Sequence, residues 1–109
     1  MAKWDIKYEI TNSTEEVDVL INASTDSDGA NTVEIFSDSV PSSGMALIDK
    51  KDATAKKKFV SVTVDGEAPC EVSTDGNKHA HKVVVEHGSS STSVTLRDKS
   101  GTLIGYTAC

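Results

Sequence analysis

The stretch WDIKYEIT, residues 4–11, decides the fold class because its side chains alternate strictly between apolar and polar. Trp4, Ile6, Tyr8 and Ile10 share one parity, and the residues between them are charged or polar. Successive side chains of a β-strand point to opposite faces, so the pattern is typical of a strand with one buried and one exposed face. The sequence therefore predicts a half-buried strand here.

The same alternation recurs along the rest of the chain. Val17, Val19 and Ile21 resume it after the polar turn at residues 12–14, which predicts that the first two strands form a hairpin. Further strands are expected at Thr32–Phe36, Met45–Asp49, Phe59–Asp65, His79–Glu86, Ser93–Asp98 and Leu103–Ala108, and the turn Asp65-Gly66 leads into Cys70 and Val72.

The segment GMALIDKKDATAKKK, residues 44–58, has helix-tolerant composition, but its apolar residues cluster at the start. An amphipathic helix needs an apolar stripe over successive turns, and this segment has none. We expect a short strand followed by a turn, with a helix as the alternative.

Short runs spaced by roughly 8–12 residues, with turn dipeptides such as Asp65-Gly66 between them, are typical of all-β domains. We expect one antiparallel β-sandwich over residues 1–109, immunoglobulin-like or related in topology, with about seven to eight strands. A small β-barrel is the alternative. A chain of 109 residues is long enough for one buried core and too short for two.

Charge and composition exclude several partners. Eleven basic residues stand against seventeen acidic ones, a net charge of −6, and aromatic residues make up only 5% of the chain. Such a protein repels phosphate backbones and offers few stacking platforms, so we expect no nucleic-acid partner.

No apolar run approaches the roughly 20 residues of a membrane span. No secretory signal is visible, so the sequence as written predicts a cytoplasmic protein, with secretion as the alternative if a signal was removed.

The two cysteines, Cys70 and Cys109, are too few for a disulfide framework and too far apart for a redox or zinc pair. Two free thiols are the expected state. A bridge is the alternative if the last strand lies beside the Cys70 segment, and it would stabilise the fold by roughly 3–4 kcal/mol.

All three histidines lie in HAHKVVVEH, residues 79–87. At about 3.3 Å per residue, His79 and His81 can converge on one ion, whereas His87 lies roughly 20 Å beyond His81. A structural zinc site needs four ligands, and the sequence identifies no third or fourth. We therefore expect solvated surface histidines and no bound cofactor, with weak metal binding through His79 and His81 as an alternative.

Five lysines crowd into a short segment: Lys50, Lys51, Lys56, Lys57 and Lys58. They are candidates for contact with an anion or an acidic partner. Lysines also keep exposed sheet edges from pairing with other chains, and this is the interpretation that we favour.

No stretch of the sequence predicts catalysis. The run His87-Gly88-Ser89 lacks an identifiable acid and oxyanion donors, and the acidic turn at residues 26–31 lacks the spacing of a calcium loop.

We expect a non-catalytic binding or interaction module that acts through loops or sheet edges on an unknown protein or glycan ligand. A structural assembly subunit of the virion or filament type, working as a homo-oligomer, is the alternative.

Overall fold

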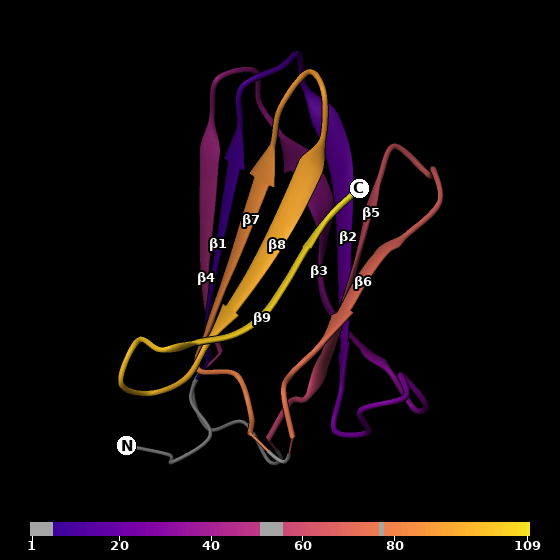
Figure 1. Ribbon diagram of the computed structural model, residues 1–109. Helices are drawn as coiled ribbons and strands as arrows, with labels where there is room; N and C mark the ends of the chain where they lie inside the picture. The colour runs from indigo at the N-terminus through magenta and orange to yellow at the C-terminus, as the bar shows by residue number, and fades with distance from the viewer. Residues whose placement is uncertain (1–5, 51–55, 77) are drawn as a thin grey trace.

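The computed structural model describes residues 6–50, 56–76 and 78–109, and its strands pack as a β-sandwich (Figure 1). The expected all-β sandwich is confirmed, and the two sheets do not close into a barrel. The described residues hold nine strands, slightly more than expected. They are β1 (Ile6–Asn12), β2 (Val17–Ser24), β3 (Val33–Val40), β4 (Met45–Lys50), β5 (Phe59–Val64), β6 (Cys70–Ser73), β7 (Lys82–His87), β8 (Thr92–Arg97) and β9 (Leu103–Ala108).

The two sheets divide the strands in an order that the sequence did not predict. Sheet A has the order β4-β1-β7-β8-β9, and sheet B has the order β3-β2-β5-β6. The expected hairpin of the first two strands is wrong, because β1 and β2 lie in different sheets. The edge of β1 away from β4 pairs with β7 and not with β2, and β1 and β7 run parallel. The sandwich is therefore mixed and not purely antiparallel.

The buried side chain of Asn12 holds the crossing from β1 to β2. Its Nδ2 donates to the backbone oxygen of Glu15 at 2.9 Å and to those of Val40 and Pro41, both at 3.2 Å. Its Oδ1 accepts from the backbone N–H of Thr14 at 3.0 Å. Because Val40 ends β3 of sheet B, this amide fastens the end of one sheet to the end of the other.

Two elements differ by more than one residue from the extent that the sequence predicts. β3 continues to Val40 through residues 37–39, which read as a loop, because this segment pairs with the start of β2. β7 begins only at Lys82, since the backbone N–H of Ala80 bonds instead to the carbonyl of Lys57 at 2.9 Å. β4 confirms the short strand expected from Met45, whereas Trp4 and residues 51–55 lie outside the described residues.

The apolar parity of the strands fills the space between the sheets. Ile6, Tyr8 and Ile10 are buried, whereas Lys7 is exposed on the outer face of sheet A. Burial raises the pKa of Tyr8, whose hydroxyl has no hydrogen-bond partner among the described residues. Packing, not hydrogen bonding, therefore holds this ring. The rest of the core includes Val19, Ile21, Val60, Val62, Val83, Val85, Val94, Leu96 and Ile104.

The connection between β2 and β3 covers part of the outer face of sheet B. Phe59 points outward from β5, opposite Ser24 of β2, and yet is only 8% exposed. A Cβ at Gly29 would lie 2.8 Å from the Phe59 ring, so the backbone of the connection packs directly on that ring. Ser73 of β6 also donates a hydrogen bond to the carbonyl of Ser27 at 2.7 Å. At this end of the sandwich, sheet B is therefore partly covered on its outer side.

Replacing Ile6 with alanine is predicted to lower the free energy of unfolding by roughly 2–4 kcal/mol, because the lost side chain leaves a cavity in the core. Val62→Ala should cost somewhat less. Lys7→Ala, one residue along the same strand but on the exposed face, should have little effect. Thermal or denaturant unfolding of the three variants measures the difference. Equally mild effects for Ile6→Ala and Lys7→Ala would contradict the assigned faces of β1.

Candidate functional site

Basic residues gather at one end of the sandwich. The strands run lengthwise, so each described connection lies at one of two ends (Figure 1). Every described lysine and arginine lies in the strand ends and connections where β1 begins and β4 stops, the lower end of Figure 1, which we call the basic end. They are Lys7, Lys50, Lys56, Lys57, Lys58, Lys78, Lys82, Arg97 and Lys99.

The opposite end carries acidic side chains, and among the residues that the structure describes it has no basic one. We call it the acidic end. The connections from β1 to β2, from β5 to β6 and from β7 to β8 lie there. The net charge of −6 thus conceals a separation of charge along the molecule. The acidic residues of this end are Glu15, Glu16, Asp18, Asp38, Asp65, Glu67 and Glu86.

Three cationic side chains form a row across the outer face of sheet A. Lys7 of β1 lies opposite Lys82 of β7, and Lys82 lies opposite Arg97 of β8. Their inward neighbours Tyr8 and Val83 are buried, so the three cations share the outer face. Like charges opposite one another on neighbouring strands destabilise a sheet. We call Lys7, Lys82 and Arg97 the basic row.

Exposed apolar side chains lie on the same face. Leu103 is opposite Arg97 and is 50% exposed, and Tyr106, two rows further along β9, is 59% exposed. Met45 lies at the far corner of the face and is also exposed. Aromatic residues, methionine and arginine are enriched at protein interfaces relative to the rest of the surface. At the basic end, the outer face of sheet A therefore combines positive charge with apolar contact area.

Of the five lysines singled out in the sequence, the structure describes the side chains of three, and these differ in exposure. Lys57 is buried, and burial lowers its pKa, whereas Lys56 is exposed and Lys58 is half-buried. Lys50 is placed only as the last residue of β4, and Lys51 lies outside the described residues. Buried Lys57 is therefore a poor candidate for contact with a partner.

Sequence reasoning missed the basic row because its members come from three distant segments. Each cation has the outward parity of its own strand, and this is the one signal in the sequence. The row appears only when the order of β1, β7 and β8 and their register are known.

His79 and His81 meet at the basic end. Their Nε2 atoms lie 3.1 Å apart, and the ring planes are inclined by 48°. The pair opens on a hollow of about 330 Å³ whose lining also includes Lys78, Asp98 and Lys99. No third histidine, cysteine, aspartate or glutamate completes a metal-binding group with them within the described part of the chain.

Asp98, in the same hollow, is engaged by the turn between β8 and β9. Its Oδ1 accepts from the backbone N–H groups of Thr102 and Ser100 at 2.9 Å and 3.0 Å. The bond from Thr102 is the main reason that the pKa of Asp98 is lowered, and Lys78 adds a smaller attraction. The Asp98 carboxylate thus serves to order the turn.

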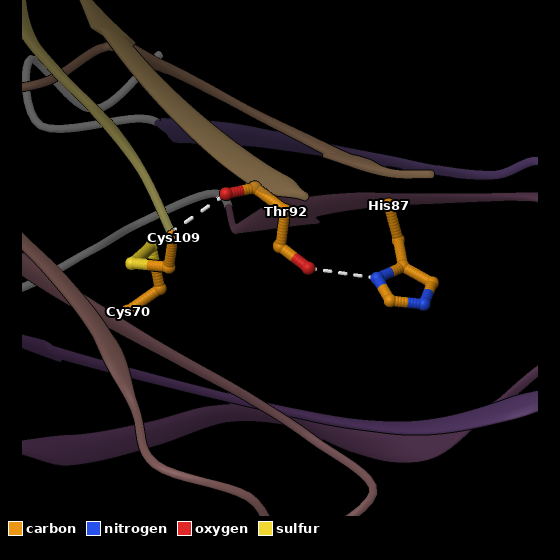
Figure 2. Close-up of a disulfide and its surroundings, with 4 residues drawn as sticks. All are labelled: Cys70, His87, Thr92 and Cys109. Atoms are coloured by element: carbon orange, nitrogen blue, oxygen red, sulfur yellow. Dashed lines mark hydrogen bonds between the residues drawn. A yellow bond between two sulfur atoms is a disulfide. The ribbon is translucent and has the colours of Figure 1, made fainter. Parts of the chain in front are cut away.

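Cys70 and Cys109 form a disulfide, so the expectation of two free thiols is wrong (Figure 2). Their Cα atoms lie 5.8 Å apart, although the residues are 39 positions apart in the sequence. Cys70 begins β6 at the edge of sheet B, and Cys109 follows β9 at the edge of sheet A. The bridge therefore joins the two sheets along one side of the sandwich.

Hydrogen bonds fix the strands beside this bridge. Cys109 and Thr92 exchange backbone hydrogen bonds of 2.8 Å and 3.0 Å, and the Thr92 hydroxyl lies 2.7 Å from Nδ1 of His87 (Figure 2). His87 also lines a hollow of about 260 Å³ next to both cysteines. The structure thus separates His87 from the other two histidines by the length of β7.

No protein-family model, curated protein or solved structure matches this chain. Within the described residues there is no helix long and apolar enough to cross a membrane.

Reduction of the Cys70–Cys109 bridge is predicted to lower the free energy of unfolding by roughly 3–4 kcal/mol, because the cross-link restricts the unfolded chain. Denaturant unfolding with and without reductant measures the loss. A variant with both cysteines replaced by alanine should show a similar loss and no response to reductant. Equal stability of the oxidised and reduced protein would contradict the bridge.

Proposed function

We propose that this protein is a non-catalytic interaction module that binds an acidic protein segment on the outer face of sheet A. The basic row carries the proposal. Like charges directly opposite one another on neighbouring strands destabilise the free protein, and an anionic partner removes that cost.

The side chains of this face suit clustered carboxylates next to apolar groups. Arg97 offers a planar guanidinium that can hold a carboxylate through two hydrogen bonds, and the flanking lysines add point charges. In the free protein, Arg97 Nη1 already donates to the carbonyl of Gly101 at 3.0 Å, which orders the side chain. Leu103 and Tyr106 supply the apolar contacts that a protein partner buries.

The charge distribution favours a short acidic segment over a long polyanion. A nucleic acid extends well beyond the basic row and would meet the rest of a molecule whose net charge is −6. An acidic peptide segment can be accommodated on the row itself.

The Cys70–Cys109 bridge further supports an oxidising compartment, where disulfides persist, over the cytoplasm.

A ten-residue glutamate peptide tests the proposal. We expect the Lys82→Glu variant to bind it about tenfold or more weakly than the parent, because Lys82 is the centre of the row and one charge-assisted contact is worth about 1.5–3 kcal/mol. Calorimetry or fluorescence anisotropy measures the affinity. The affinity should fall as the salt concentration rises from about 50 to about 200 mM, because salt screens exposed charges.

Lys56→Glu is the matched control, since it makes the same charge change at the same end but beside sheet B. The proposal predicts that it has a much smaller effect than Lys82→Glu. Equal losses for the two variants, or affinity that ignores salt, would contradict a binding surface at the basic row. Tight binding of a sulfated glycan without binding of the peptide would show that the partner is a glycan and not a protein.

A structural assembly subunit is the second candidate, and the acidic end favours it. A second copy could place its acidic end on the basic row of the first, with opposite charges in contact. Such a head-to-tail contact uses two different surfaces of each copy, and it generates filaments when the rotation does not close.

Light scattering over a range of concentrations tests this second candidate. Head-to-tail assembly predicts a mass that grows with concentration at low salt, returns to the monomer at high salt, and stays monomeric for Lys82→Glu. A parent protein that is monomeric at every concentration in low salt would exclude assembly. Binding of the glutamate peptide does not depend on that result, because it is measured separately.

A further inference from the structure

The facing nitrogens of His79 and His81 have the spacing of two ligands on one metal ion. First-row metals bind histidine nitrogen at about 2.0–2.1 Å. An ion placed at that distance from two Nε2 atoms 3.1 Å apart would subtend an N–metal–N angle of about 100°. This angle lies between the square-planar and tetrahedral values. From this geometry we propose that His79 and His81 form a two-histidine chelate for Cu²⁺.

The backbone around Ala80 prepares this arrangement before any metal arrives. Ala80 is buried in the core, so its two neighbours project to the opposite side of the chain. The N–H of Ala80 bonds to the carbonyl of Lys57 at 2.9 Å, and the N–H of His81 bonds to that of Arg97 at 2.8 Å. The backbone that carries the two rings is therefore already ordered before a metal binds.

Metal binding requires both rings to adopt the same tautomer. In the metal-free pair, a hydrogen bond between the Nε2 atoms requires one to donate and the other to accept. Both Nε2 lone pairs face an ion only when each neutral ring carries its proton on Nδ1. The exchange moves one proton from Nε2 to Nδ1 and changes neither charge nor oxidation state.

The surroundings favour Cu²⁺ and an open site. Cu²⁺ binds nitrogen and oxygen ligands most strongly among the divalent first-row ions and accepts tetragonal geometry. With no third protein ligand among the described residues, water or an external ligand fills the other positions in the hollow. Lys78 and Lys99 line that hollow and lower its affinity for a cation, whereas Asp98 partly offsets them. The site is therefore peripheral, and the fold does not depend on it.

Titration of chelator-treated protein with aqueous Cu²⁺ tests the proposal, read by calorimetry and by electron paramagnetic resonance. We expect one ion per chain with coupling to two histidine nitrogens. His79→Ala and His81→Ala should each weaken binding by about 100-fold and leave coupling to one nitrogen, because removal of a ligand exceeds the 10–100-fold effect of removing an outer hydrogen-bond partner. Both residues lie outside the core, and the melting temperature of each variant without metal should equal that of the parent.

His87→Gln is the matched control, because it removes the one other histidine and retains a hydrogen-bonding group beside Thr92. The proposal predicts unchanged Cu²⁺ affinity for this variant. Lys99→Ala should bind more tightly than the parent, since it removes a like charge from the hollow. The proposal is overturned if the parent binds no Cu²⁺, if His79→Ala and His81→Ala bind as the parent does, or if His87→Gln loses as much affinity as they do.

Discussion

The hydrogen bonds of the Asn12 amide hold the crossing of the chain from sheet A to sheet B. By donating to the carbonyls of Val40 and Pro41, this side chain holds the end of β1 against the end of β3, and the chain enters sheet B at Val17. A two-strand hairpin, which the sequence also allows, would bury β1 and β2 in one sheet. The crossing instead places their apolar faces opposite each other, and the core forms between them.

The surface chemistry follows from the same crossing. Because β2 is not beside β1, the side of β1 away from β4 is free to pair with β7, and the parallel register puts Lys7 next to Lys82. Antiparallel pairing of β7 with β8 then adds Arg97 to the row. The backbone N–H of Lys7 bonds to the carbonyl of His81 at 3.0 Å, so this pairing also anchors the histidine pair. The basic row and the candidate metal site are thus two consequences of one strand pairing.

The sequence predicts what happens within a strand much better than what happens between strands. Alternation identified the buried face of β1 and the strand at Met45, because side-chain direction depends only on the local backbone. The partner of each strand depends on turns and on hydrogen bonds between distant residues, such as those of Asn12, and no local pattern records them. The same limit applies to the bridge of Cys70 with Cys109, since two sheet edges must first lie side by side. The approach of His79 to His81 was predictable, because side chains two residues apart on an extended chain lie on the same side.

We propose that the outer face of sheet A at the basic end is the contact surface of this protein. Nuclear magnetic resonance of ¹⁵N-labelled protein, titrated with the glutamate peptide, tests it residue by residue. We expect the largest amide shift changes at Lys7, Lys82 and Arg97, extending to Leu103, with little change at the acidic end. Changes centred on the acidic end, or on the outer face of sheet B, would contradict it.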